Sequence, residues 1–153
     1  MPSAAETENT IEINRSASEV YATLIDIEQW ERWSLWSSKV DATMEVEFQP
    51  HPNITGSEMR WSGKYSGKGN LVFKHAVQDS ELHIMLNIQD GKFQLPGIIR
   101  LEIVSPEKTN VRWTNTVRFG NNPMKRYIGS SIVNVIERDI GFCLNGLKQY
   151  AEK

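Results

Sequence analysis

The histidines are the first residues of this chain to consider for metal binding or acid–base chemistry. His51 lies in "HPN", a sequence typical of a solvated turn. His75 and His83 lie on neighbouring segments of alternating apolar residues, and the strand pairing derived below directs them to opposite faces of a sheet. No Cys–His or His–x–His spacing brings a further ligand to them. The sequence therefore predicts neither a bound metal nor another cofactor.

Two further features could carry chemistry but have simpler interpretations. "GKYSGKG" resembles a phosphate-binding loop, but it lacks that loop's glycine spacing and the Ser or Thr after lysine, and it joins two predicted strands. A hairpin turn explains it. Cys143, the single cysteine, falls on the apolar stripe of a predicted helix, which indicates a packed and unreactive thiol. A lone cysteine also excludes an internal disulfide and suits a reducing compartment.

Polar residues on an apolar strand face are the better candidates for a binding site. His75 and Asn115 each interrupt a run of inward-facing apolar residues. Burying such a group without a hydrogen bond costs about 1–3 kcal/mol. Each therefore either has a partner within the protein (the backbone, Tyr127, Ser131, Asn134 or an ordered water) or faces a cavity and orients a polar group of a ligand. The sequence leaves both possibilities open.

Three of the five tryptophans fall within "WERWSLW". Trp30 and Trp33 share one face of a predicted short helix and are expected to pack in the core. Trp36 follows this helix, and both a cavity position and a core position are open to it. The mixed charges around the three indoles argue against a platform for stacking nucleic-acid bases.

Local signals predict the elements that position these residues. "TIEINRS" alternates as a strand does, and Ser16 with Glu19 forms a capping box that starts a helix. Asp26 and Gln29 repeat this spacing and predict a second short helix. The segment "VDATMEVEF" predicts another strand, whose inward set of side chains is Ala42, Met44, Val46 and Phe48.

A hairpin turn at Asp90-Gly91 sets the register of the central strands, because pairing the residues around it places apolar side chains opposite one another. Continuing across "QDSE" pairs His75 with Ile84. Extending the pattern in both directions predicts a six-stranded antiparallel meander with one apolar face. The residues expected on that face include Met59, Trp61, Leu71, Phe73, Leu101, Ile103, Val111, Trp113, Val117 and Phe119.

The chain closes with a predicted long helix, which Asn122 can cap and whose first turn Pro123 suits. Apolar residues recur along it every three or four positions, as on a helix that faces a sheet. They are Met124, Ile128, Ile132, Ile136, Ile140, Cys143 and Leu147. The element order predicts an α+β fold, in which a curved antiparallel sheet (one N-terminal strand and the six-stranded meander, with two short helices between them) wraps around the long helix.

These segments resemble the polyketide cyclase/dehydrase-like branch of the START-like (SRPBCC, helix-grip, birch-pollen-allergen-like) superfamily. The resemblance runs from about Ile11 to Ala151 and is carried by "INRSASEVYATLIDIEQWERWSLW", "GSEMRW", "NVRWTNT" and "NPMKRYI…DIGFCLNGLKQYAE". It implies a helix-grip fold, two short helices that support the C-terminal half of the long helix, and a cavity between sheet and helix. The superfamily includes ligand carriers, cyclases and co-chaperone-like proteins, so the resemblance is more specific for fold than for function.

Length and composition narrow the functional classes. The 153 residues suit a single START-like domain over residues 10–153, preceded by a flexible tail over residues 1–9. A net charge of −2 disfavours nucleic acid as a partner. The polar start is unlike a secretion signal, and no run of about 18 apolar residues could span a membrane. We expect a cytoplasmic protein without stable membrane insertion, and the oligomeric state stays open.

Two functions remain after these exclusions. The first is binding of a small, largely apolar ligand (lipid-, polyketide- or aromatic-like) between the sheet and the long helix. The alternative is a cyclase or dehydratase that uses His75 and Tyr127 as acid–base groups, although no carboxylate is expected to point inward. A protein-interaction module would need a large exposed apolar patch, which the charged outer face does not predict. The expected cavity residues are Trp36, Met44, Met59, Trp61, Phe73, His75, Trp113, Asn115 and Tyr127.

Overall fold

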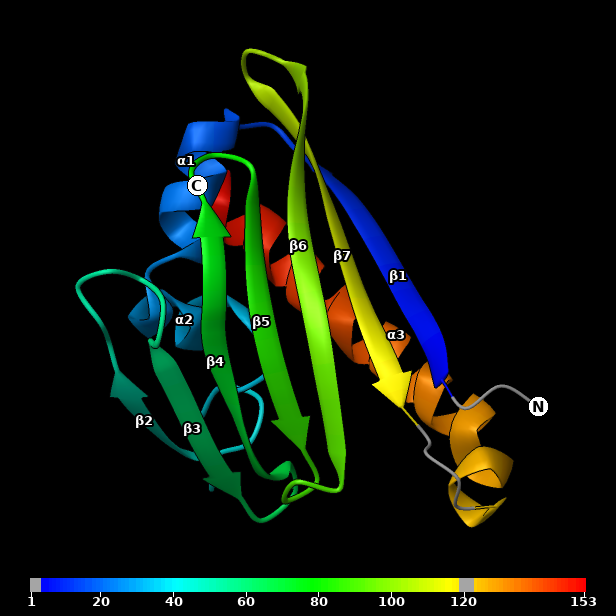
Figure 1. The fold of residues 1–153 in the computed structure, drawn as a ribbon. Coiled ribbons are helices and arrows are strands. Elements are labelled where there is room, and N and C mark those ends of the chain that lie inside the picture. The colour runs from blue at the N-terminus through cyan, green and yellow to red at the C-terminus, as the bar shows by residue number, and fades with distance from the viewer. Residues whose placement is uncertain (1–3, 119–122) are drawn as a thin grey trace.

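The computed structural model describes the backbone of residues 4–118 and 123–153, and the side chains of residues 4–118 and 131–153. A seven-stranded antiparallel sheet has the order β1-β7-β6-β5-β4-β3-β2. It curves around one long helix, so the predicted α+β helix-grip fold is confirmed (Figure 1). In chain order the elements are β1 (Ala4–Ile13), α1 (Ala17–Leu24), the short 3-10 helix η1 (Ile27–Gln29), α2 (Trp30–Trp33), β2 (Glu45–Gln49), β3 (Glu58–Gly63), β4 (Gly67–Val77), β5 (Glu81–Ile88), β6 (Phe93–Ser105), β7 (Lys108–Arg118) and α3 (Pro123–Ala151).

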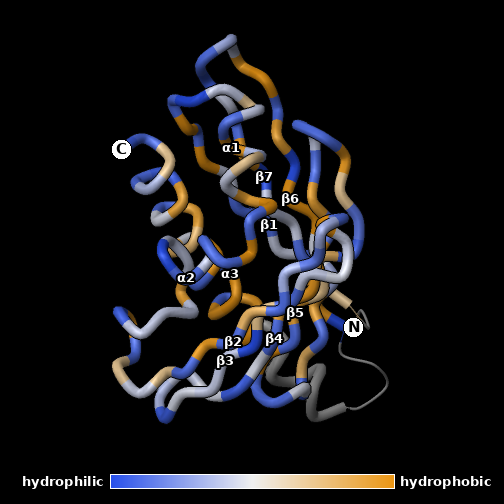
Figure 2. The backbone as a smooth tube through the Cα atoms, turned by 90° about the vertical axis from the view of Figure 1, so that its left-hand side faces the viewer, coloured by the Kyte–Doolittle hydropathy of each residue, from blue (hydrophilic) through white to orange (hydrophobic). Residues whose placement is uncertain are grey.

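Helices α1, α2 and α3 lie on one side of the sheet, as the side view in Figure 2 shows. The core therefore forms between the inner sheet face and the helices. Helix α3 passes so close to α2 that a Cβ atom at Gly146 would collide with the backbone oxygen of Trp33. Trp30 and Trp33 are buried as predicted, and the Trp30 indole donates a hydrogen bond to the backbone oxygen of Leu24 at 2.7 Å.

Strand β1 begins at Ala4, earlier than the sequence analysis expected, so residues 4–9 are not a flexible tail. The strand pairs along its whole length with β7, from Ala4 opposite Arg118 to Ile13 opposite Thr109. Asn9 on this strand also donates a hydrogen bond to the backbone oxygen of Glu137 in α3 at 2.9 Å. The sequence did not predict this part of the strand, because its polar residues show no alternation with apolar ones.

Both predicted helix starts are present. The Ser16 hydroxyl accepts a hydrogen bond from the Glu19 backbone N–H at 3.2 Å and donates to the Glu19 carboxylate at 3.0 Å. Asp26 accepts from the backbone N–H of Glu28 at 3.3 Å and from the side chain of Gln29 at 2.8 Å. These caps begin α1 and η1, and η1 leads directly into α2.

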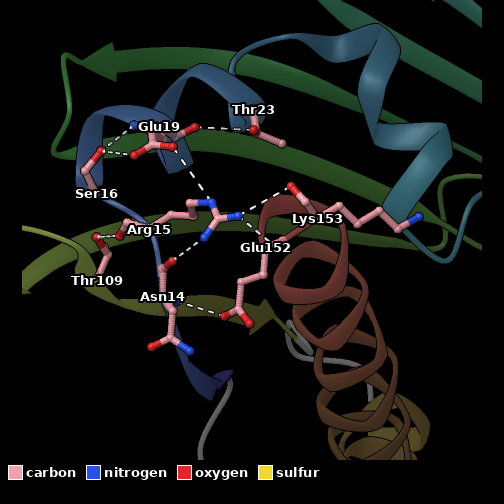
Figure 3. Close-up of polar contacts among 8 residues, drawn as sticks. All are labelled: Asn14, Arg15, Ser16, Glu19, Thr23, Thr109, Glu152 and Lys153. Atoms are coloured by element: carbon pink, nitrogen blue, oxygen red, sulfur yellow. Dashed lines mark hydrogen bonds and ion pairs between the residues drawn. The ribbon is translucent and has the colours of Figure 1, made fainter.

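A polar cluster fixes the C-terminal end of α3 against the junction between β1 and α1 (Figure 3). Arg15 donates to the backbone oxygen of Glu152 at 2.9 Å, and the Glu152 carboxylate accepts from the backbone N–H of Asn14 at 2.8 Å. Thr109 donates to the backbone oxygen of Arg15 at 2.8 Å. Because Asn14 and Arg15 connect β1 to α1 and Glu152 directly follows α3, the cluster helps set the position of α3 over the sheet.

The predicted register holds for β5 and β6, where Ile88 lies opposite Phe93 as expected. It is wrong for β4 and β5. Phe73 pairs with Ile84, and a bulge at Lys74 then brings His75 opposite His83. The bulge turns every residue beyond it to the other face of the sheet. His75 is therefore exposed on the outer face.

Two further inward positions were predicted wrongly. Strand β2 starts at Glu45, so Ala42 lies in the preceding turn and is exposed, while Met44 is buried as expected. Ile103 is 74% exposed, because the hairpin of β6 and β7 extends beyond the helices at this end of the sheet (Figure 1). The outer half of that hairpin has no helix to pack on.

Candidate ligand-binding cavity

A cavity of about 240 Å³ lies between the middle of α3 and the strands β3, β5 and β6. Most of its lining is apolar, and Tyr65, Ser66, Gln89 and Asp139 supply the polar groups. Concave, mostly apolar sites with a few placed polar groups are typical of small-molecule binding. The apolar lining consists of Leu35, Trp36, Trp61, Leu86, Ile88, Leu95, Val135, Ile136 and Ile140.

Two stacked tryptophans form one wall of the cavity. The ring centroids of Trp36 and Trp61 are 4.6 Å apart, with an interplanar angle of 24°. The stack requires a glycine on the next strand, because a Cβ atom at Gly69 would collide with the Trp61 indole. Gly69 is the direct partner of Trp61 across β3 and β4. Close backbone approach is a recognised use of glycine within a strand.

The turn between β3 and β4, which carries Tyr65 and Ser66, is held by a buried carboxylate. One Asp41 oxygen accepts hydrogen bonds from the backbone N–H groups of Tyr65 and Ser66 at 3.1 and 3.0 Å. The other accepts from the hydroxyl and the backbone N–H of Thr43 at 2.6 and 2.9 Å. These bonds, that of the Thr43 hydroxyl above all, lower the pKa of Asp41 to about 2. Asp41 thus positions the rim of the cavity without lining it.

Asp139 is the acidic residue of the described cavity lining, so the expectation that no carboxylate points inward is wrong. It lies on α3 between two cavity residues, Ile136 and Ile140, and its side chain is 34% exposed. Burial raises its pKa above the ordinary value, while neighbouring Arg138, at 3.4 Å, acts in the opposite direction. The helical period could have revealed it, since a residue three positions after Ile136 and four before Cys143 shares the inward stripe.

Of the predicted cavity residues, Trp36 and Trp61 line the cavity. Phe73 and Trp113 instead pack in the core against Trp30, with ring centroids 5.9 and 5.7 Å from it. Two more predicted residues, Met44 and Met59, are buried but do not line the cavity. The side chain of Tyr127 lies outside the described residues, and His75 lies on the outer sheet face.

Asn115 is a core residue of β7. It is 1% exposed, and its side-chain oxygen accepts a hydrogen bond from the Trp113 indole at 3.3 Å. Its amide nitrogen has no partner among the described residues, and neither has the hydroxyl of Thr7, which lies opposite it on β1. Gly97, its neighbour on β6, has no room for a Cβ atom beside the Asn115 oxygen. Asn115 does not line the cavity.

Cys143 lies on α3 and is fully buried. Its sulfur accepts a hydrogen bond from the backbone N–H of Leu35 at 3.4 Å. Burial raises the pKa of the thiol to about 12, so the nucleophilic thiolate is scarce at neutral pH. The thiol therefore packs as an apolar group.

The outer sheet face carries the histidine pair that the predicted register separated. The rings of His75 and His83 lie 5.3 Å apart between centroids, and His83 is 3.1 Å from a Glu81 oxygen. Across residues 4–118 and 131–153, no three His, Cys, Asp or Glu side chains gather closely enough to hold a metal ion.

No helix in the described part of the chain has the length and apolar character to cross a membrane.

The sequence profile described as "Polyketide cyclase / dehydrase and lipid transport" matches residues 4–152. The chain belongs to this family. The family assignment agrees with the observed curved sheet and long helix. No curated protein sequence matches the chain.

Solved structures share the fold of this family member at low sequence identity. The Zhui aromatase/cyclase from Streptomyces sp. R1128 has a TM-score of 0.70 at 14% identity, covering 97% of this chain and 94% of that one. Norcoclaurine synthase from Thalictrum flavum, solved with dopamine and hydroxybenzaldehyde, has a TM-score of 0.72 at 7% identity, covering 96% and 86%. The Aha1 dimer from Colwellia psychrerythraea has a TM-score of 0.65 at 14% identity, covering 97% and 96%. At these identities the similarity supports the fold alone.

Proposed function

We propose that this protein binds a small, largely apolar molecule in the cavity beneath α3. The single observation that carries the proposal is a cavity of about 240 Å³ with a mostly apolar lining and a stacked tryptophan pair in its wall. An apolar body placed there would be removed from water on several sides, at about 25 cal/mol for each Å² buried. The volume lies just below the usual range for ligand sites, about 300–1,000 Å³, and suits a compact molecule.

A cyclase or dehydratase is the second candidate, but with different residues from those first expected. His75 lies on the outer face, so it cannot act on a molecule in the cavity. The observation that favours chemistry is Asp139, a carboxyl group in the cavity wall whose pKa is raised by burial. Such a group suits proton transfer. The family description and the aromatase/cyclase relative support this candidate.

Titration with the neutral fluorescent probe N-phenylnaphthylamine tests the binding function. The native protein should bind one equivalent saturably. Ile136→Trp fills the cavity with a larger side chain and should abolish this binding, while His75→Ala on the outer face should leave it unchanged. Circular dichroism and the denaturation midpoint establish that each variant is folded. Equal affinity in the native protein and a folded Ile136→Trp variant would place the probe elsewhere and contradict the proposal.

A further inference from the structure

We propose that Asp139 makes this cavity selective for ligands that join an apolar body to a protonated amine. The inference rests on the proposed binding function and names the class of ligand. Asp139 lies on α3 among apolar lining residues, with Ile136 about one turn before it on the same helical face and Ile140 directly after it in the sequence. Among the described residues, the cavity lining contains no Lys, Arg or His. The formal charge of this described lining at neutral pH is therefore negative and comes from the Asp139 carboxylate.

Within residues 4–118 and 131–153, the Asp139 carboxylate has no strong counter-charge. Its ion-pair partner is Arg138, at 3.4 Å, whose side chain is 75% exposed. Such pairs are weak and screened by salt. The Cys143 thiol on the same helix is fully buried, and because burial raises its pKa it stays neutral and supplies no counter-charge. An ammonium group entering the cavity would supply the missing charge, whereas an anionic group would be repelled.

The aromatic wall favours the same ligand class for an independent reason. The faces of indole rings carry negative electrostatic potential and attract cations. Trp36 and Trp61 both line the cavity that Asp139 lines. A ligand can therefore place its apolar body against the tryptophan pair and its cationic group between an indole face and the carboxylate. Ser66 and Gln89 provide neutral hydrogen-bonding groups in the lining and give no preference for charge.

A matched series of probes tests this selectivity. Naphthylethylamine, naphthylethanol and naphthylacetate share one apolar ring system and differ in charge. The native protein at neutral pH should bind the amine about 10-fold more tightly than the alcohol, because a charge-assisted hydrogen bond replaces a neutral one, and the acetate most weakly. Asp139→Asn removes the charge at nearly constant shape and should bring the amine to within about 2-fold of the alcohol.

The control is Glu137→Gln, which removes a charge from the same helix outside the cavity lining and should keep the order of the three probes. A measurement on the native protein does not depend on how the variants fold. Lowering the pH until Asp139 is protonated should abolish the preference for the amine and leave the alcohol unaffected. Equal binding of amine and alcohol, or tightest binding of acetate, would overturn the selectivity and leave the cavity function standing. Failure of all three probes to bind would instead count against the cavity function itself.

Discussion

Trp36 and Trp61 stack with ring centroids 4.6 Å apart, although they come from the segment after α2 and from strand β3. The pair forms part of the wall of the cavity between the sheet and α3. Each indole is nearly buried, at 5% and 4% exposure, and each still lines the cavity. The same two side chains therefore contribute to folding and to the proposed binding surface.

Replacing Trp36 should affect stability and binding together. Trp36→Leu removes an aromatic stacking partner and part of the cavity wall. We expect the free energy of unfolding to fall by about 1–3 kcal/mol and N-phenylnaphthylamine to bind several-fold more weakly. Trp36→Phe keeps an aromatic ring and should retain most of both. Chemical denaturation and probe titration measure the two effects, and unchanged affinity in a folded Trp36→Leu variant would remove this residue from the site.

Gly69 should not tolerate a side chain. In Gly69→Ala the new methyl group would collide with the Trp61 indole and with the backbone oxygen of Asn87. Overpacking of this kind costs about 1–3 kcal/mol, which denaturation would detect as a lower midpoint. Gly141→Ala is the matched control, because its methyl group would meet only the Asn9 side chain at 3.4 Å and alanine favours a helix. Equal midpoints for the two variants would show that the stack is not constrained by Gly69.

Protonation of Asp41 should make the protein less stable in acid. Its pKa is lowered from 3.8 to about 2 in the native state, so its stabilising effect is complete above 3.8 and is lost as the pH falls to about 2. Asp41→Asn should remove this part of the pH dependence. It should also weaken probe binding, because an amide has one acceptor oxygen instead of two and cannot accept from both Thr43 and the turn with Tyr65 and Ser66. Asp26→Asn, a change of helix cap, should alter stability by only a few tenths of a kcal/mol. The measurement is the free energy of unfolding over acidic pH. If Asp41 had no such role, this free energy would change with pH equally in Asp41→Asn and in the native protein.

Asp139 should have the opposite effect on stability. Burial raises its pKa in the native state, so the native protein holds this proton more tightly than the unfolded chain, and stability falls as the pH rises above the ordinary value of 3.8. Asp139→Asn should therefore raise the denaturation midpoint at neutral pH, while Glu137→Gln should not. A residue that lowers stability and lines a cavity is typical of a site kept for binding and not for folding. A lower midpoint for Asp139→Asn would show that the carboxylate stabilises the fold.

The sequence predicted the elements that depend on local chemistry. Ser16 and Asp26 cap their helices, and the Asp90-Gly91 turn fixes the pairing of β5 with β6. The predicted register failed in β4, where one extra residue reverses which side chains of the strand face inward. The bulge at Lys74 has no signal in the alternation of apolar residues, and it moves His75 from the expected cavity to the outer face. A register error of this kind changes the candidate site while leaving the fold intact.

The cavity itself was only partly predictable, because its position depends on how α3 sits over the sheet. The inward orientation of Trp61 follows from the alternation of side chains along β3. Phe73 and Trp113 have the same inward orientation, but they pack against Trp30 and fill the core instead. Asp139 was missed because the inward stripe of α3 was identified by apolar residues alone. The distinction between core and cavity requires the three-dimensional packing of the helices.

The most direct test of the binding account is to follow the indole N–H resonances of the five tryptophans by NMR during titration with naphthylethylamine. If the ligand occupies the proposed cavity, the signals of Trp36 and Trp61 should shift progressively and saturate, while those of Trp30 and Trp113, buried in the neighbouring core, should stay near their starting positions. Saturating shifts confined to Trp30 and Trp113, or binding that leaves the Trp36 and Trp61 signals unchanged, would contradict the account.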